Sequence, residues 1–292
     1  MRAIGINTWV WTSPLTDAAL PDLLQTIAAA GFDGVELPLE NAGDLDSHAT
    51  AALLKEHGLA AWVVGAMAPG RDLVATSAET VAATQGYLRS CIDLASAVGA
   101  PSVCGPFYAQ TGRVWRMTPD ERTAAYAEWR EHLAPVADYA GEHGVRIGIE
   151  PLNRYETSLI NTVDQALTGL GPLLDAAHGG VGLALDTYHL NIEERSSAAA
   201  IRAAGEHLVH VQVCGSDRGA PGGDQTDWPA IVAALDEVGY AGPLTIESFT
   251  PDNASIAVAA SIWRPLAASP DALATEGLAF LRSLFAEGGV HV

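Results

Sequence analysis

The chain contains little positive charge and few cysteines. Of its 292 residues, 15 are Lys or Arg and 35 are Asp or Glu, which gives a formal net charge of −20. Such an acidic surface repels phosphate backbones, so we expect no nucleic-acid partner. The three cysteines, Cys91, Cys104 and Cys214, have no CxxC spacing. This pattern is typical of reduced thiols, so we expect a cytoplasmic protein in which Cys104 and Cys214 are packing residues.

Long apolar runs and nucleotide-binding fingerprints are missing as well. No window of the sequence approaches the ~20 apolar residues that a membrane-spanning helix requires. Residues 1–7 (MRAIGIN) enter a predicted strand directly, without the apolar region of a signal peptide. No Gly-rich dinucleotide or P-loop fingerprint follows any predicted strand. These absences argue against a membrane partner and give no indication of a nucleotide site.

What the chain does contain is a strict alternation of strand-like runs and amphipathic segments. Hydrophobic residues make up 49% of it, enough for a substantial core. Eight β-branched or aliphatic runs are predicted as strands, namely residues 3–10, 34–39, 60–67, 102–107, 146–152, 181–186, 208–213 and 243–248. Amphipathic segments are predicted as helices at residues 17–30, 47–57, 78–98, 119–143, 163–176, 196–204, 228–238 and 270–286. This order predicts a single-domain (β/α)8 TIM barrel over residues 1–292, with a doubly wound open sheet as the alternative.

Four successive predicted strands carry a polar residue at or within two residues of their C-terminal end. These residues are Glu150, Asp186, Gln212 and Glu247. The C-terminal ends of barrel strands form the face that carries the active site, so we expect the four side chains to converge. The three carboxylates would repel one another unless a divalent cation lay between them. The pattern therefore predicts a metal site, although one such residue taken alone would more simply be a solvated loop residue or a helix cap. Three irregular stretches, residues 108–118, 214–226 and 249–269, are expected on the same face.

The segments around these residues resemble the xylose-isomerase-like sugar epimerases, the group that contains D-tagatose 3-epimerase and D-psicose (allulose) 3-epimerase. Residues 150–157 (EPLNRYET) look like the strand-five motif of that family, and residues 186–194 (DTYHLNIEE) match its strand-six motif. Residues 215–222 (GSDRGAPG) resemble its strand-seven loop, and residues 262–267 (IWRPLA) resemble part of the loop after strand eight. The resemblance extends over nearly the whole chain and also implies a TIM barrel.

The resemblance implies a set of metal ligands. In this family the metal is held by Glu, Asp, His and Glu, which implies Glu150, Asp186 and Glu247 here. The place of the family's His is taken by Gln212, as in the hydroxypyruvate isomerase branch of the same superfamily. All-oxygen ligation favours Mn²⁺ or Mg²⁺ over Zn²⁺, so we expect Mn²⁺, with Co²⁺ or Mg²⁺ as alternatives. His210 lies on the same face of the predicted strand but one pleat deeper, and is the alternative ligand.

Several substrate contacts are also implied. Arg218 matches a family arginine that bonds substrate oxygens near the reacting carbon. Glu156 matches a residue that bonds the terminal hydroxyl of the sugar and orients His189, a further substrate contact. Trp115 is predicted to cover the sugar as a lid. The plainer interpretations are a surface ion pair for Arg218, a surface charge for Glu156, and packing or capping roles for the other two.

The implied chemistry is proton transfer beside a sugar carbonyl. Epimerising a ketose at C3 means removing a proton and returning it to the opposite face, and the resemblance implies Glu150 and Glu247 as the two acid/bases. We therefore predict a divalent-metal-dependent epimerase or isomerase of free ketoses, such as D-tagatose, D-fructose, D-allulose or L-ribulose, that forms a homo-dimer or homo-tetramer. The alternatives are a hydroxypyruvate-isomerase-like aldose–ketose isomerase, the catalytic subunit of a C-glycoside-cleaving lyase, and a non-catalytic sugar-binding barrel.

Overall fold

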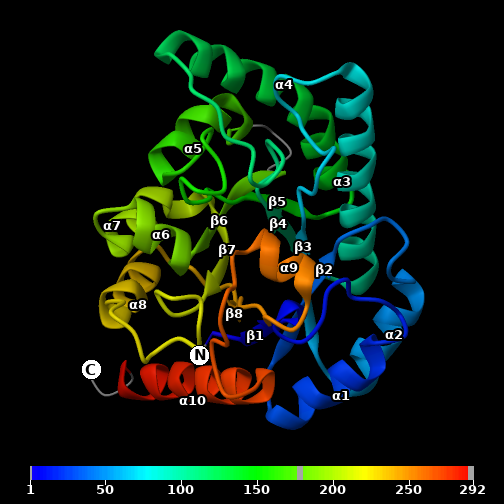
Figure 1. The fold of residues 1–292 in the computed structure, drawn as a ribbon, viewed down its shortest axis with the longest axis vertical. Helices are drawn as coiled ribbons and strands as arrows, with labels where there is room; N and C mark the ends of the chain where they lie inside the picture. The colour runs from blue at the N-terminus through cyan, green and yellow to red at the C-terminus, as the bar shows by residue number, and fades with distance from the viewer. Residues whose placement is uncertain (1, 176–179, 289–292) are drawn as a thin grey trace.

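Eight parallel strands close into a barrel in the computed structural model, which describes residues 2–175 and 180–288 (Figure 1). The strands are β1 (Ile4–Asn7), β2 (Gly34–Leu39), β3 (Ala60–Gly65), β4 (Ser102–Gly105), β5 (Arg146–Ile149), β6 (Val181–Asp186), β7 (Leu208–Val213) and β8 (Leu244–Ile246). Each strand pairs with the next along the chain, and β1 also pairs with β8. This closure confirms the (β/α)8 barrel, and the alternative of an open doubly wound sheet is wrong.

Helices follow the strands and cover the outside of the barrel (Figure 1). The main ones are α1 (Leu20–Ala30), α2 (Ser47–His57), α3 (Ala78–Val98), α4 (Pro119–Glu142), α5 (Val163–Leu170), α7 (Ser197–Ala204), α8 (Trp228–Glu237) and α10 (Pro270–Gly288). Short helices lie between them, namely α6 (Thr187–Glu193), α9 (Ala254–Ala259) and the 3-10 turns η1 (Thr8–Val10), η2 (Gly171–Leu173) and η3 (Gly205–His207). Among the helices of the described ranges, none is both long and apolar enough to cross a membrane.

The barrel interior is filled from below by a tryptophan. A Cβ at Gly34 would lie 2.5 Å from the Trp62 ring, and one at Gly5 would lie 2.6 Å from it. Only glycine leaves room for the indole at these two positions, because no side chain competes for the space. Higher up, Glu36 of β2 hydrogen-bonds His210 of β7 and Thr245 of β8. Since β2 is not a neighbour of β7 or β8 in the sheet, these three side chains must point into the barrel.

Several strands end earlier than the sequence predicted. Strand pairing stops at Asn7, Gly65, Gly105, Ile149 and Ile246, whereas the predicted strands continued to residues 10, 67, 107, 152 and 248. The chain leaves the sheet at these points and turns across the active-site face. At the end of β1, for example, the Asn7 side chain accepts a hydrogen bond from the Trp9 amide and so starts a 3-10 turn. The residues beyond the strand ends are therefore the ones that build the site.

Two segments for which the sequence predicted no helix each contain a short helix in the structure. The Asp186 side chain accepts a hydrogen bond from the Tyr188 amide at 2.9 Å and begins α6, so this carboxylate caps a helix as well as ending a strand. Part of the stretch 249–269 forms α9. The helix predicted over residues 163–176 instead ends at Leu170, where Gly171 leaves the helical conformation (φ 47°, ψ −121°); residue 176 falls outside the described residues. The cysteines Cys91, Cys104 and Cys214 are all free and buried.

Candidate active site

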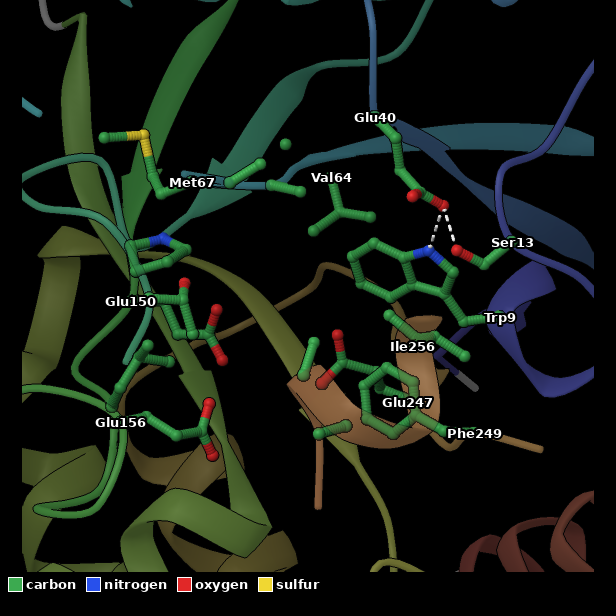
Figure 2. A pocket seen from close by; sticks show the side chains of 18 of the residues that line it. Trp9, Ser13, Glu40, Val64, Met67, Glu150, Glu156, Glu247, Phe249 and Ile256 are labelled. Carbon is green, nitrogen blue, oxygen red and sulfur yellow. Dashed lines mark hydrogen bonds between the residues drawn. The ribbon is translucent and has the colours of Figure 1, made fainter. Parts of the chain in front are cut away.

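The C-terminal ends of the strands open into a cavity of about 320 Å³ (Figure 2). This volume lies at the lower end of the roughly 300–1,000 Å³ that small-molecule sites occupy. Glu150 and Glu156 line one end of the cavity, Trp9 and Glu40 line the other, and Glu247 lies between them (Figure 2). The cavity thus has one polar end beside the strand-end carboxylates and a second polar group, Glu40, at its opposite end.

The four strand-end residues converge, as their positions in the sequence indicated. Arg218 Nη1 contacts Asp186 Oδ2 and lies 3.0 Å from Glu247 Oε2. The Gln212 amide donates to Glu247 Oε1 at 3.0 Å. Glu150, Asp186 and His189 each offer one possible ligand atom within 4.8 Å of the other two. The sequence had not assigned His189 to this group. The metal-binding and catalytic roles of the four residues remain predictions.

Two oxygen atoms in this cluster lack a hydrogen-bond partner. They are Glu150 Oε1 and Gln212 Oε1, both fully buried. Buried polar atoms are rarely left unpaired, and an exception calls for an explanation such as an ion. With the carboxylates of Asp186 and Glu247, these oxygens form an all-oxygen donor set of the kind that hard divalent cations prefer. The residues present therefore fit the divalent cation that the sequence predicted.

The electrostatics of the cluster separate its three carboxyl groups. Burial, and next the negative charge of Asp186, raise the pKa of Glu150 well above its ordinary value. Burial also raises the pKa of Glu247, reinforced by Glu150 and opposed by the charge of Arg218. Burial acts upward on Asp186 too, but the charge of Arg218, together with His189 and the hydrogen bond from the Tyr188 amide, outweighs it and holds the pKa of Asp186 below its ordinary value. Two carboxyls that can carry a proton thus lie beside one that stays ionised.

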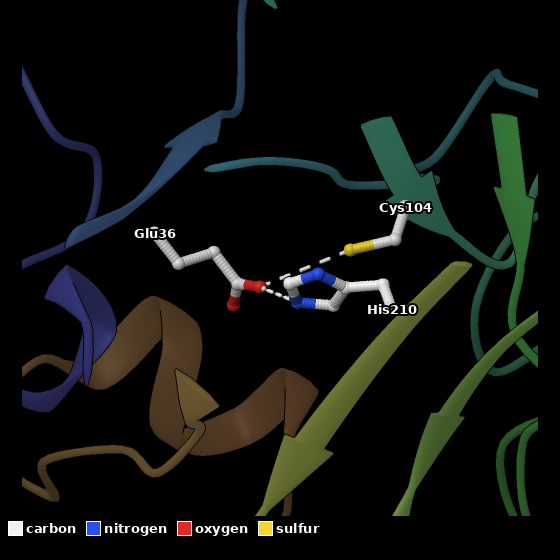
Figure 3. Close-up of side chains that lie close together, drawn as sticks. All are labelled: Glu36, Cys104 and His210. Atoms are coloured by element: carbon white, nitrogen blue, oxygen red, sulfur yellow. Dashed lines mark hydrogen bonds and ion pairs between the residues drawn. The ribbon is translucent and has the colours of Figure 1, made fainter. Parts of the chain in front are cut away.

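The alternative ligand His210 is buried, with its ring beside Glu36 and Cys104 (Figure 3). Its Nε2 lies 2.6 Å from Glu36 Oε1 and 3.0 Å from Thr245 Oγ1. Cys104 Sγ lies 3.9 Å from the same Glu36 oxygen. Burial acts to raise the pKa of Glu36, but the hydrogen bonds and charge of His210 and the hydrogen bond from Gln212 hold it below its ordinary value. His210 is therefore a partner of Glu36 on the floor of the site.

Sequence reasoning missed Glu36. The signal was present, because a carboxylate within the otherwise apolar strand 34–39 (GVELPL), all of it buried, needs a partner. Glu36 accepts hydrogen bonds from Asn7 Nδ2 at 2.7 Å and from Gln212 Nε2 at 2.9 Å, in addition to His210. The floor of the site is thus joined to the strand-end cluster through Gln212.

His189 lies beside Glu150 and is held by Asn153. The Asn153 amide N–H donates to His189 Nδ1 at 3.0 Å, which directs Nε2 toward Glu150 Oε1 at 3.5 Å. Glu156 reaches His189 through the same residue, since Asn153 Nδ2 donates to Glu156 Oε1 at 2.6 Å. Burial, assisted by the nearby charge of Arg218 and opposed by Glu156, lowers the pKa of His189. The lowered pKa favours the neutral imidazole, whose Nε2 lies 3.2 Å from Arg218 Nη2 as well as 3.5 Å from Glu150 Oε1.

Arg218 is not a surface ion pair, because its side chain is buried against the cluster. Its guanidinium stacks over the rings of Tyr188 and Phe249, at 4.4 and 5.1 Å from their centroids. Its backbone adopts φ 70°, a left-handed conformation that costs free energy in a residue with a Cβ. The Ser248 hydroxyl donates to the Arg218 carbonyl at 2.6 Å and helps to hold this conformation.

Trp115, the predicted lid, lies away from this cavity. Its ring packs under the Arg113 guanidinium at 4.6 Å, its amide donates to Ser158 Oγ at 2.9 Å, and it borders a separate depression next to Met117. The aromatic walls of the cavity are instead Trp9 and Phe249, whose ring centroids are 5.6 Å apart. Residues directly after a strand end, such as Phe249, are better candidates for the wall than residues far along a loop.

The sequence matches one family model over most of its length. The model describes the xylose isomerase-like TIM barrel and matches residues 24–284. Among curated relatives, the L-ribulose 3-epimerase of Methylomonas sp. (strain DH-1) is 32% identical, over 96% of this chain and 97% of the relative. The ketose 3-epimerase of Arthrobacter globiformis is 33% identical, over 96% of this chain and 95% of the relative. Both relatives are epimerases of ketoses.

Solved structures give the same result. An L-ribulose 3-epimerase superposes with a TM-score of 0.88 at 30% identity, covering 99% of this chain and 98% of that one. A D-allulose 3-epimerase from Methylomonas sp. in complex with D-allulose superposes with a TM-score of 0.85 at 30% identity, covering 97% and 96%. The similarity thus includes the whole barrel and the face that carries the cavity.

Proposed function

The chain belongs to the xylose isomerase-like TIM-barrel family and is an isomerase-class enzyme, and we propose that it interconverts free ketoses that differ in configuration at C3. The observation that carries this proposal is the pair Glu150 and Glu247. These carboxyls come from the ends of strands β5 and β8 and line the same cavity from different sides (Figure 2). A protein that only bound sugar would not need two such groups.

The two carboxyls have the properties that epimerisation requires. One removes the proton from C3 and the other returns a proton to the opposite face, so both must be able to hold and release it. Burial raises the pKa of Glu150 and of Glu247 and so favours the protonated form, whereas a bound divalent cation would favour the ionised form, so each carboxyl can take up and release a proton. The enediolate between the two steps carries negative charge that the site must stabilise.

A divalent cation would be held by Glu150, Asp186, Gln212 and Glu247. We propose Mn²⁺, with Co²⁺ or Mg²⁺ as alternatives, because the donors are all oxygen atoms. When bound, the ion supplies Lewis-acid stabilisation of the charge that develops on the substrate oxygens.

The remaining predicted contacts orient the sugar. Arg218 and His189 line the cavity beside the two carboxyls and would bond the oxygens near C3. Glu156, fixed by Asn153, would bond the terminal hydroxyl next to the carbonyl. Trp115 is not proposed as a lid, because its ring packs against Arg113 outside the cavity lining.

The cavity suits an uncharged sugar better than a sugar phosphate. Arg218 is the one Lys or Arg side chain among the described residues that line it, and Arg218 already pairs with Asp186 and Glu247. The lining also includes Glu40 and Glu156. A phosphate group with nearly two negative charges would find little to neutralise it there. The proposed substrates are therefore free ketoses such as D-tagatose, D-fructose, D-allulose and L-ribulose.

One observation favours a second candidate. Gln212 stands where the epimerases that this chain resembles carry His, and the hydroxypyruvate isomerases have Gln there. An aldose–ketose isomerase would use the same enediolate but return the proton to a different carbon. The two reactions differ in which carbon lies between Glu150 and Glu247.

Deuterium exchange separates these reactions. The protein with Mn²⁺ is incubated with a panel of ketoses in D₂O, and the labelled carbon is identified by NMR. Deuterium at C3 with a new epimer supports the proposed function, and deuterium at C1 or C2 with an aldose product supports the isomerase. No label in any sugar would refute both and return attention to a sugar-binding barrel, or to a lyase subunit that requires a partner.

We also propose a homo-dimer or homo-tetramer whose interface includes the active-site face. Among the residues that the structure describes, the most exposed large hydrophobic side chains are Val114 (55%), Tyr155 (76%), Val258 (64%) and Trp263 (73%). All four lie in segments that follow strands β4, β5 or β8, and therefore on the active-site side of the barrel. Exposed hydrophobic residues gathered on one face are typical of an interface.

A further inference from the structure

The end of the cavity opposite Glu156 carries an acid that the proposed reaction does not use. Glu40 follows β2 directly and is half-buried, and its side chain lines the cavity with Trp9 and Ser13 (Figure 2). One of its oxygens, Oε1, accepts hydrogen bonds from Trp9 Nε1 at 2.9 Å and from Ser13 Oγ at 2.6 Å. Within residues 2–175 and 180–288, no donor bonds the other oxygen, Oε2. One carboxylate oxygen of Glu40 is thus held by two hydrogen bonds, and the other is available to accept a hydrogen bond.

No cation within the described ranges pairs with this carboxylate. The nearest candidate, Arg71, donates to the backbone carbonyls of Ala66 and Glu40, each at 2.6 Å, and its guanidinium stacks on the Tyr87 ring at 3.6 Å. Arg71 therefore supports the backbone of Glu40 without neutralising its side chain. The result is a fixed, negatively charged acceptor at the far end of the cavity.

The wall between the two polar ends is apolar. Val64, Met67, Phe249 and Ile256 line it (Figure 2). A ketose whose first three carbons lie between the catalytic carboxyls would run its remaining carbons along this wall. C–H groups suit such a wall, whereas the hydroxyl at the end of the chain needs a polar partner. The acceptor at the end of the wall is Glu40.

We infer that Glu40 determines specificity for the far end of the substrate by accepting a hydrogen bond from its terminal hydroxyl. The site thereby selects neutral ketoses with a primary hydroxyl over analogues that lack that hydroxyl or carry phosphate on it. A site that hydrogen-bonds a hydroxyl discriminates against the analogue without it, because its own polar group is then left unpaired. This inference rests on the proposed ketose epimerisation.

The test compares D-fructose, 6-deoxy-D-fructose and D-fructose 6-phosphate in the Mn²⁺-loaded protein and its variants. We expect the wild type to prefer D-fructose over the 6-deoxy sugar by at least ~10-fold in kcat/KM. Glu40→Ala should bring that ratio near one, mainly by raising KM for D-fructose. Glu40→Gln keeps an acceptor but removes the charge. It should therefore retain part of the preference for D-fructose over the 6-deoxy sugar and reduce the difference in kcat/KM between D-fructose and D-fructose 6-phosphate. Glu56→Ala removes an exposed acid from α2 and should leave both ratios unchanged.

Each outcome decides the inference. If Glu40→Ala turns over D-fructose as the wild type does and keeps the same ratio of kcat/KM between D-fructose and the 6-deoxy sugar, the inference about Glu40 is overturned. The epimerase proposal would then remain intact. If Glu40→Ala does not fold, as judged by circular dichroism, Glu40→Gln decides, and an unchanged gap between D-fructose and its phosphate overturns the inference. A wild type that exchanges no proton with any ketose would refute the proposed function, and the role of Glu40 would be refuted with it.

Discussion

Gln212 and Glu36 are joined by a buried hydrogen bond, from Gln212 Nε2 to Glu36 Oε2 at 2.9 Å. An ionised carboxylate only accepts hydrogen bonds, so Glu36 holds the amide nitrogen toward the floor of the barrel. The carbonyl oxygen of Gln212 is then left buried without a hydrogen-bond partner. Rotation of the amide would place that oxygen against Glu36 and against Glu247, so the orientation is fixed by charge.

Glu36→Gln is expected to weaken binding of the metal. Without the Glu36 carboxylate, only Glu247 holds the nitrogen of the Gln212 amide, so the amide can turn that nitrogen toward the ion more easily. Changes to groups that orient a ligand typically cost ~10–100-fold in affinity. Titration calorimetry of the metal-stripped protein with Mn²⁺ measures this. Glu56→Gln serves as the control for the loss of one charge. An unchanged Kd in a folded Glu36→Gln protein would contradict the role of Glu36.

Gln212→His is expected to retain the metal but change its preference. Imidazole is a competent ligand, and its second ring nitrogen can donate to Glu36 as the amide does. Affinity should shift toward softer ions, so the ratio of the Zn²⁺ and Mn²⁺ dissociation constants should fall relative to wild type. An unchanged ratio of the two dissociation constants in Gln212→His would contradict the assignment of Gln212 as a ligand.

Glu150→Gln and Glu247→Gln are each expected to abolish epimerisation. Either change removes a proton carrier as well as an anionic ligand, and general acid–base catalysis alone contributes ~10²–10⁴-fold. Turnover and deuterium exchange at C3 are measured at saturating Mn²⁺, with calorimetry to establish that the metal is bound. Near-wild-type turnover in either variant would refute the two-base mechanism.

Free ketoses are expected to be better substrates than their phosphates by at least ~10-fold in kcat/KM, which corresponds to about 1.4 kcal/mol in transition-state binding. The reason is the acidic lining of the cavity, in which Arg218 already has two carboxylate partners. Kinetics with D-ribulose and D-ribulose 5-phosphate measure the difference. Equal or better turnover of the phosphate would mean that the assignment to free sugars is incorrect.

The exposed hydrophobic side chains on the active-site side of the barrel predict an interface between copies of the chain. Tyr155→Ser and Trp263→Ser each replace a large exposed ring, and each is expected to shift a homo-oligomer toward smaller species. Light scattering after size exclusion gives the mass of each variant, with the exposed Glu56→Ser as the matched control. A wild-type protein that is monomeric at every concentration would rule out the homo-oligomer.

Local patterns in the sequence were enough to predict the barrel and the four polar residues at the ends of its strands. Apolar runs of strand length alternate with amphipathic segments from one end of the chain to the other, and this local pattern has one common closed solution. Because parallel strands of a barrel end on the same face, the convergence of Glu150, Asp186, Gln212 and Glu247 followed from their positions alone. The predicted C-terminal ends of several strands were too late in the sequence, because strand pairing stops where the chain turns toward the site.

How the side chains pair across the barrel depends on closure of the sheet and could not be predicted from the sequence. Glu36 and His210 are 174 residues apart in the chain, yet their side chains are 2.6 Å apart. No local pattern records such a contact, since it depends on closure of the sheet and on the height of each residue in it. The same holds for Trp115, whose amide bonds Ser158, 43 residues away, outside the cavity lining, and for Glu40, which the fold brings to the far end of the cavity. Local periodicity fixes which residues share a face, whereas the partners of a buried polar group are set by the packing of distant strands.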